Sequence, residues 1–518
     1  MRWNRFIPAS GKSPECNCAR VLARATNLWL RVQRMTRRAS VPTGLPLEAQ
    51  LWQRACSWVG AFVRVRVSVS MLRCGQRWGG GSKPLALASA LWFSFIAVAQ
   101  PAPSTVDLAC HWSAQLTVAR PEVSDSYLVP FDLLIEHAPG GLRATLLNGS
   151  DRIEFSSVNF SSNAQQGNQI TLRLDQYDAT LSAHCSDVQA PCDTLEGEYV
   201  RQKGSSLLHY AFRAQCPPAS ANPEHIPASL PQLSPQGSNA SDWQFAFTDA
   251  SGKPDSEPNA PAHFSQNANH VEGTIAPVSG DYGTLAGEIS GGNGAELHLS
   301  RFDGIHALRL DGRLVVPGRI EGVFHIAPGV ALNYVATATG ASTGFEESEH
   351  LTSVAHPSEP FRFHGADASG AIITQADPRF RGKVVLLDIF GTWCPNCHDE
   401  APVLQSLYAQ FHARGLEIVG LSFEYVDDRA RSQRLIQVYR SKYHIDFPLL
   451  LAGTTDAGQI GKALPQLRNF GAYPTTIFLD RHGRVRLIHA GFSGPATGRL
   501  EEVKQSFQRT IVKLLAEQ

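Results

Sequence analysis

An uninterrupted apolar run followed directly by two cysteines constrains the fold of this chain most strongly. The run KVVLLDIF spans residues 383–390, and the segment GTWCPNCHDEAP follows it at residues 391–402. A strand with one solvent face alternates apolar and polar residues, whereas this run does not alternate, so it predicts a strand covered on both faces. Strands of this kind belong to sheets with helices on both sides. We therefore predict an α/β domain in which the cysteine pair lies where a central strand meets a helix.

The residues around this run repeat the alternation of strand and helix. The pattern begins near residue 359, and we place the α/β domain at residues 359–518. Residues 401–415 carry apolar side chains at helical spacing and end at Gly415, a residue type common at helix ends. Further strands are predicted at 416–424, 447–453, 475–480 and 484–492, with helices at 430–444 and 498–517.

The region before this domain has a different pattern. Residues 105–217 and 243–342 consist of short alternating runs separated by turn residues, which predicts strands. A proline-rich stretch at 218–242 predicts a linker between them. We predict a multidomain fold in which an N-terminal β-rich, sandwich-like region precedes the α/β domain. The second block is either a second β-rich domain or one half of a sandwich.

The N-terminal part of the chain carries a targeting pattern. Residues 71–99 combine basic residues, a short apolar stretch and small residues up to Ala99, as secretory signal peptides do. Residues 1–70 have no clear role before such a signal, so they are a doubtful basic extension or reflect a mis-assigned start. We expect a periplasmic or otherwise extracytoplasmic protein that is soluble after signal cleavage; the alternative is a protein anchored by an uncleaved signal.

Charge is distributed unevenly along the chain. Residues 1–70 contain 12 Lys and Arg against two acidic residues, whereas the part after residue 99 contains 31 basic and 44 acidic residues. Nucleic-acid phosphates and anionic lipids repel an acidic protein. We therefore expect no nucleic-acid partner.

The cysteines that follow the predicted signal are even in number, as in exported proteins with disulfides. Four of the six lie in the first β-rich block, and we pair Cys110 with Cys216 and Cys185 with Cys192 as structural disulfides. Four cysteines allow three pairings, so the other two pairings stay open. A zinc site is less favoured because the spacing is irregular, and we expect no metal.

The remaining pair, Cys394 and Cys397, lies at the predicted start of a helix. The unpaired N–H groups and the helix dipole stabilise a thiolate there, so Cys394 is the expected attacking thiol. Cys397 lies one turn later and can resolve a mixed disulfide, while Pro395 fits the first helical turn. The alternatives are a structural zinc site, a c-type haem site suggested by CPNCH, and a permanent disulfide, which an exposed helix start does not favour.

Several motifs together resemble the TlpA/ResA-like thiol–disulfide oxidoreductases of the thioredoxin superfamily. GTWCPNC resembles the active-site segment of this family, and DRHGRV and GFSGP resemble its terminal hairpin. YPTT resembles its proline loop, which implies a cis peptide bond between Tyr473 and Pro474 beside the dithiol. Pro402 matches the proline that kinks the active-site helix. The resemblance covers residues 359–518 and implies a thioredoxin fold.

The resemblance also implies roles for individual residues. Asp388 matches a buried acidic residue that assists proton transfer to the second cysteine, and Glu400 matches an acidic residue that tunes the pair. Their structural alternatives are a hydrogen-bonded buried carboxylate and a glutamate that complements the helix dipole. Trp393, with Pro395, Tyr473 and Pro474, is expected to form the substrate-docking surface. His398 and Asp399 are expected to be solvated residues of the first helical turn.

These inferences predict an exported thiol–disulfide oxidoreductase that needs no cofactor beyond its own disulfide. The resemblance favours a reductant that is recharged by a membrane electron donor and acts on thiol- or disulfide-bearing exported proteins, with apocytochromes as one possibility. The alternatives are a binding protein whose β region does the main work, with a redox latch, and a thiol peroxidase. The β-rich region is expected to recruit a partner, to dimerise the protein or to bind a ligand. No oligomeric state is predicted.

Overall fold

The fold is described from a computed structural model. The residues that it describes are 107–120, 123–163, 167–185, 192–217, 232–233, 240–291, 294–339 and 351–517. The predicted signal peptide, the extension before it and most of the predicted linker lie outside the described residues. All described residues belong to one compact unit, residues 101–518. None of the helices within the described ranges is long and apolar enough to cross a membrane.

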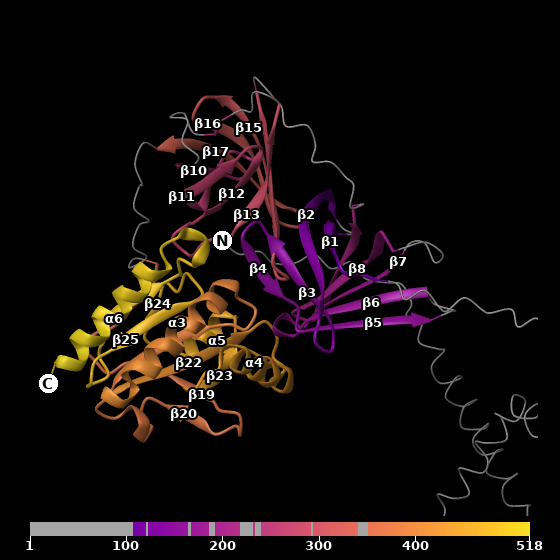
Figure 1. The fold of residues 1–518 in the computed structure, drawn as a ribbon. Helices are drawn as coiled ribbons and strands as arrows, with labels where there is room; N and C mark the ends of the chain where they lie inside the picture. Colours follow the sequence, from indigo (N-terminus) through magenta and orange to yellow (C-terminus); the bar gives the residue numbers. More distant parts are fainter. Residues whose placement is uncertain are drawn as a thin grey trace, which may run out of the picture. The chain divides into compact units, whose positions relative to one another are not determined.

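The first β-rich block forms one antiparallel sheet of nine strands (Figure 1). Its strands are β1 Cys110–Arg120, β2 Val123–Ala138, β3 Gly141–Asn148, β4 Asp151–Glu154, β5 Ser157–Asn163, β6 Gly167–Leu174, β7 Ala179–Cys185, β8 Thr194–Lys203 and β9 Ser206–Gln215. The order across the sheet is β4-β3-β2-β1-β9-β8-β7-β6-β5. The two edge strands, β4 and β5, are consecutive in the chain and are joined by Phe155 and Ser156. The Phe155 amide donates to the Ala144 carbonyl of β3 (3.0 Å), and the Ser156 amide donates to the Arg173 carbonyl of β6 (2.7 Å), so this link bonds to both ends of the sheet. The sheet therefore curls around its own core.

Two disulfides hold this sheet. Cys110 is bonded to Cys216, which joins the start of β1 to the residue after β9, with a Cα–Cα distance of 6.1 Å. Cys185 is bonded to Cys192 across the β7–β8 connection, with a Cα–Cα distance of 5.4 Å. These are the two pairs proposed from the sequence.

The second β-rich block is a closed antiparallel barrel of eight strands. Its strands are β10 Ala240–Thr248, β11 Pro254–Asn267, β12 His270–Ile275, β13 Leu285–Ser290, β14 Glu296–Phe302, β15 Ala307–Val316, β16 Arg319–Ala327 and β17 Val330–Thr339. The barrel closes where β10 pairs with β17, in the register Asp242↔Thr339 to Thr248↔Asn333. Trp243, Phe245 and Phe324 fill its interior.

The predicted sandwich is thus replaced by a curled sheet and a separate closed barrel. Alternation along a strand shows which side chains are buried, but both architectures bury one face of each strand. The choice between them depends on the pairing of the first and last strands, which are far apart in sequence.

The barrel contacts the nine-stranded sheet through the turn between β14 and β15 and the residues next to it. The Tyr127 hydroxyl donates to the Ala307 carbonyl (2.9 Å), and the Tyr199 hydroxyl donates to the Gly304 carbonyl (2.5 Å). Phe302 packs within the core of the sheet, 5.0 Å from the Phe131 ring. The two β-rich parts therefore share a continuous packed boundary.

The C-terminal region has a seven-stranded mixed sheet in the order β20-β19-β23-β22-β21-β25-β26 (Figure 1, orange to yellow). Its strands are β19 His364–Ala366, β20 Ile372–Thr374, β21 Val384–Phe390, β22 Leu416–Glu424, β23 Leu449–Thr454, β25 Thr475–Leu479 and β26 Val485–Ala490, and a separate pair is formed by β18 Ser353–Val354 and β24 Leu467–Arg468. The helices are α3 Pro395–Phe411, α4 Arg429–Tyr443, α5 Ala457–Ala463 and α6 Leu500–Ala516, with short 3-10 helices η4 Pro378–Phe380, η5 His412–Arg414 and η6 Pro495–Thr497. The 3-10 helix η2 Asp175–Tyr177 lies instead in the nine-stranded sheet, between β6 and β7.

Strand β21 is the centre of this sheet, and all seven of its residues are buried. Its side chains alternate between two cores. Leu386 and Phe390 pack with residues of α3, α4 and α6, whereas Leu387 and Ile389 pack with Ile460 of α5 and with residues near the start of the domain. This two-sided burial is the arrangement that the uninterrupted apolar run predicts.

Candidate active site

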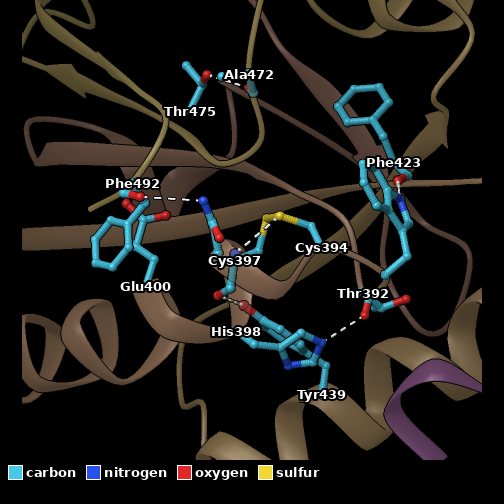
Figure 2. Close-up of a disulfide and its surroundings, with 12 residues drawn as sticks. Thr392, Cys394, Cys397, His398, Glu400, Phe423, Tyr439, Ala472, Thr475 and Phe492 are labelled. Carbon is cyan, nitrogen blue, oxygen red and sulfur yellow. Dashed lines mark hydrogen bonds between the residues drawn. A yellow bond between two sulfur atoms is a disulfide. The ribbon is translucent and has the colours of Figure 1, made fainter. Parts of the chain in front are cut away.

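The cysteine pair lies at the N-terminus of α3, directly after the central strand. Cys394 and Cys397 form a disulfide with a Cα–Cα distance of 5.2 Å (Figure 2). The Cys394 sulfur accepts a hydrogen bond from the Cys397 amide (3.2 Å), and Pro395 occupies the first helical position. When the disulfide is reduced, the same amide and the helix dipole stabilise a Cys394 thiolate.

Both cysteines are more buried than an exposed helix start implies. Cys394 is 4% exposed and Cys397 is 1% exposed. The expectation of an exposed pair was therefore wrong. Residues of the proline loop and of a barrel loop line a cavity together with Cys394, and neither neighbour can be read from the residues next to the motif.

Two buried carboxyl groups lie on the α3 side of the sheet. Glu400 is one helical turn after Cys397, and its Oε1 accepts a hydrogen bond from the Thr476 hydroxyl (2.7 Å). Asp388 lies two residues from both Leu386 and Phe390, so its side chain is on the same face of β21 as theirs. It pairs with Thr476 of the neighbouring strand β25. One oxygen of each carboxyl, Asp388 Oδ1 and Glu400 Oε2, is buried without a hydrogen-bond partner.

Burial controls the protonation of this carboxyl pair. Burial raises the pKa of Glu400 to about 8, and the Thr476 hydrogen bond opposes this only in part. Burial, together with the neighbouring Glu400 charge, raises the pKa of Asp388 well above its usual range. A thiol ordinarily has a pKa of about 8.5, so a proton can pass between a thiol and a carboxyl of raised pKa at little free-energy cost. The pair is suited to proton exchange with the dithiol.

An aromatic group covers the dithiol on the side of the proline loop. The Trp393 indole stacks on Tyr425 with ring centroids 4.3 Å apart, and its Nε1 donates to the Phe423 carbonyl (2.9 Å). The Tyr473 ring meets Trp393 edge-on at 5.1 Å. The peptide bond between Tyr473 and Pro474 is cis, as the family resemblance implies.

The residues after the dithiol are not solvated, contrary to expectation. His398 is 6% exposed, and its two ring nitrogens contact the Tyr443 hydroxyl and the Thr392 carbonyl, each at 2.8 Å. Burial lowers the pKa of His398 to about 3, so the ring is neutral near pH 7. Asp399 is half-buried, and burial, with the nearby Asp281 charge, raises its pKa to about 8. Helix α4 and the barrel cover these residues, and they are distant in sequence.

Two residues that hold the backbone around the dithiol, Glu424 and Tyr439, were not predicted from the sequence. Glu424 ends β22 and accepts hydrogen bonds from the Thr392 amide (3.1 Å) and hydroxyl (2.8 Å), which fixes the turn before the dithiol. The Tyr439 hydroxyl donates to the Cys397 carbonyl (2.7 Å) from α4. A polar residue that ends an apolar strand, as Glu424 does, was a local signal that could have been used. The position of Tyr439 depends on how α4 packs and had no such signal.

A cavity of about 660 Å³ opens beside Cys394. Trp393, Asn396 and Tyr473 line it together with α5 and the proline loop. The opposite side consists of barrel residues, at positions 277, 279–282 and 306. The sequence indicated no catalytic constellation in the β-rich region, but it did not reveal that this region borders the dithiol. Within the described ranges, no cluster of three or more His, Cys, Asp or Glu side chains is placed to bind a metal ion.

The C-terminal region of the chain is similar to known proteins. Residues 359–488 match the model of the AhpC/TSA family. The thiol:disulfide interchange protein DsbE of Escherichia coli (strain K12) is 32% identical over 156 residues, which cover 30% of this chain and 75% of DsbE. The thiol–disulfide oxidoreductase ResA of Halalkalibacterium halodurans is 27% identical over 132 residues, covering 25% of this chain and 63% of ResA.

The similarity to solved structures has the same extent. A thioredoxin-family thiol:disulfide interchange protein from Chlorobium tepidum TLS is 21% identical, with a TM-score of 0.24. The match covers 32% of this chain and 100% of that protein.

Proposed function

The chain belongs, through its C-terminal region, to the TlpA/ResA-like thiol–disulfide oxidoreductases of the thioredoxin superfamily, and from that premise we propose that it exchanges the Cys394–Cys397 disulfide and dithiol with cysteine-bearing proteins outside the cytoplasm. The observation that carries the proposal is the position of the disulfide. It caps the N-terminus of α3 on the side of the sheet that also holds the two buried carboxyl groups.

The exchange proceeds in two balanced steps when the reduced protein meets a partner disulfide. The Cys394 thiolate attacks one partner sulfur, the partner S–S bond breaks, and the other partner sulfur leaves as a thiolate that takes up a proton. Cys397 then loses its proton toward the carboxyl pair of Asp388 and Glu400 and attacks the Cys394 sulfur. The second partner thiol is released and the Cys394–Cys397 disulfide forms, so two electrons pass to the partner.

The direction of exchange and the compartment are also proposals. We place the protein as a reductant whose dithiol is restored by a membrane electron donor, as the family resemblance favours. Two features support a compartment outside the cytoplasm. The disulfides Cys110–Cys216 and Cys185–Cys192 are of a kind that persists in oxidising compartments, and residues 71–99 have the pattern of a signal peptide. The dithiol itself would serve as the redox centre, without a further cofactor.

The order of the two steps can be tested by trapping. A Cys397→Ser variant should accumulate mixed disulfides through Cys394, because the resolving thiol is missing. The Cys394→Ser variant is the matched control and should trap none, as seen on non-reducing gels after acid quenching. Absence of trapped partners with Cys397→Ser, with the fold intact by circular dichroism, would contradict the exchange mechanism.

The peroxidase alternative predicts a different pattern. A thiol peroxidase that works through one cysteine would still consume hydrogen peroxide after Cys397→Ser, whereas the exchange protein would not turn over. Measuring peroxide consumption and reduction of a protein disulfide on the same variant separates the two functions.

A further inference from the structure

The cavity beside Cys394 has one wall that the chemistry of exchange does not require. This wall is the segment between β12 and β13, residues 276–284, which we call the wall loop. Its residues Pro277, Ser279, Gly280, Asp281 and Tyr282 line the cavity. The loop belongs to the barrel, and it faces the attacking sulfur.

A buried carboxylate fixes the wall loop in place. Asp281 is 6% exposed, and its Oδ2 accepts a hydrogen bond from the Gly494 amide (2.6 Å), in the segment that follows β26. Its Oδ1 accepts from the Gly283 amide (2.8 Å), within the loop itself. Both oxygens are therefore occupied, and the loop is tied to the C-terminal domain and shaped by the same side chain.

Two glycines allow the loop to lie directly on the edge of the active site. Gly280 has a φ of +134°, and a Cβ atom there would collide with the Asn396 amide group in the first turn of α3. Gly491 has a φ of +79°, and a Cβ atom there would lie 2.7 Å from the Val278 carbonyl oxygen. Backbone contacts this close leave no space for a side chain. The loop therefore packs against the first turn of α3 and against the segment after β26.

The lining of the cavity is mainly apolar. The apolar and aromatic side chains come from both sides and are Pro277, Tyr282, Trp393, Ile460, Leu467, Phe470 and Tyr473. The side chains of Asp281 and His306 also border it. Asp281 is held by backbone amides, and His306 Nδ1 lies 3.1 Å from the Asp303 carboxylate. Of the polar side chains in the lining, Ser279 donates to Glu257 and Asn396 donates to the Phe492 carbonyl. The surface that a substrate would meet is therefore mainly apolar.

We propose that the wall loop restricts exchange to extended cysteine-bearing polypeptide segments whose neighbouring side chains are apolar. This inference rests on the proposed function and names its substrate class. A cavity of about 660 Å³ is within the range of about 300–1,000 Å³ typical of ligand pockets. Docking of a folded partner instead takes a surface of about 800 Å² from each protein. A short extended chain fits the cavity, whereas a disulfide that lies flat on a folded domain does not reach Cys394.

The test compares disulfides of different shape and flanking chemistry. The probes are a short peptide with its cysteine between leucines, the same peptide with aspartates in place of the leucines, and cystamine, the peptides being presented as mixed disulfides with cysteamine. A folded protein domain with one surface disulfide is the fourth probe. The wild-type protein should reduce the leucine peptide with a kcat/KM on the order of tenfold above the aspartate peptide, because burial of one apolar side chain is worth about that factor. The folded domain should be the poorest substrate.

A substitution within the cavity makes the test specific. Gly461 lies on α5 and lines the cavity, and a Cβ atom there meets nothing within 4 Å, so Gly461→Trp fills space without a clash. The adjacent exposed residue Lys462 does not line the cavity, so Lys462→Trp is the matched control. Gly461→Trp should lower kcat/KM for the leucine peptide by about tenfold and for cystamine by less, whereas Lys462→Trp should change neither.

A second variant opens the wall. Asp281→Ala removes the bond to Gly494 and should raise the rate on the folded domain relative to the leucine peptide. If Asp281→Ala does not fold, the Gly461→Trp comparison still decides the question. Equal rates for both peptides and the folded domain, or an unchanged leucine-peptide rate in Gly461→Trp, would overturn the inference. If the wild-type protein reduces none of the four probes, cystamine included, the proposed exchange function itself is overturned.

Discussion

The C-terminal domain and the barrel both border the dithiol, but they contribute different things. The C-terminal domain supplies the sulfur atoms, the helix N-terminus and the carboxyl groups of Asp388 and Glu400. The barrel supplies the wall loop and the His306 side chain, and none of the reacting atoms. The chemistry of exchange therefore depends on residues close together in the sequence. Access of a substrate to Cys394 depends on the barrel, which is distant in the sequence.

The largest expected effect lies in the C-terminal domain. Cys394→Ala should lower the reduction of every disulfide probe by more than about a thousandfold, because no other group replaces the attacking thiolate. Tyr282→Ala in the wall loop is the comparison variant and should change the ratio between probes while leaving exchange measurable. A fluorescent peptide-disulfide assay reports both. Comparable losses from the two substitutions would show that the barrel takes part in the chemistry itself.

The next effect concerns the stability of the nine-stranded sheet. Replacing Cys110 and Cys216 with serine opens a loop of 106 residues and should lower the free energy of unfolding by about 5 kcal/mol. The Cys185–Cys192 bond closes a separation of only 7 residues, so its loss should cost about 2 kcal/mol. Denaturant unfolding followed by Trp112 fluorescence measures both. Exchange by Cys394 on cystamine should survive either change, which keeps stability and chemistry apart.

Glu400→Gln should slow release of the mixed disulfide by about a hundredfold above about pH 8, where the Glu400 carboxyl is ionised, because a neutral amide cannot accept the Cys397 proton. The glutamine can still accept the hydrogen bond from the Thr476 hydroxyl, so the packing is retained. Rapid-quench measurement of mixed-disulfide decay tests this. Unchanged decay would assign proton transfer to Asp388 or to water.

The same carboxyl gives a pH dependence of stability. The folded pKa of Glu400 is about 8 against an ordinary value of 4.5, so the folded state keeps a proton that the unfolded state loses between these values. The stabilising contribution is complete below about pH 4.5 and decreases as the pH rises to about 8. Glu400→Gln should make the unfolding free energy of the oxidised protein less dependent on pH in this window. Thermal unfolding at a series of pH values provides the measurement.

The smallest expected effect is at a boundary between the sheet and α4. Asp178 accepts from Arg431 Nε and pairs with Arg434, both at 2.9 Å. Asp178→Asn should cost about 1 kcal/mol or less, since partly exposed ion pairs contribute little. Asparagine tolerates the left-handed backbone at this position, where φ is 51°, so the change tests the charge alone. A larger loss, or altered exchange, would show that this contact helps to position the active site.

The sequence predicted the C-terminal domain in considerable detail. The apolar run at 383–390 became a strand buried on both faces, and the predicted elements after it correspond to β22, α4, β23, β25, β26 and α6. These patterns are readable because each reflects local periodicity. The short helix α5 was missed because its seven residues include two glycines and give no helical period.

Parts of the site were equally readable. Asp388 and Glu400 could be singled out because a charged residue within an apolar run or one turn after a cysteine pair is visible in the sequence. The burial of Asp388 was expected from its strand, whereas the burial of Glu400 and the 6% exposure of His398 could not be seen. Burial depends on what packs over a residue, and His398 is contacted by Tyr439 and Tyr443 of α4 and by Tyr177 of the nine-stranded sheet.

The place of the reactive cysteine pair, and the strand and helix that hold it, could be read from the chain because those features depend on neighbouring residues. The curled sheet and the closed barrel could not, since closure depends on long-range pairing between β10 and β17. The position of residues 276–284, which face Cys394, could not be read from the chain either. The loop is held there by a hydrogen bond between Asp281 and Gly494, which are 213 positions apart in the chain. No local sequence pattern predicts a contact between residues so far apart.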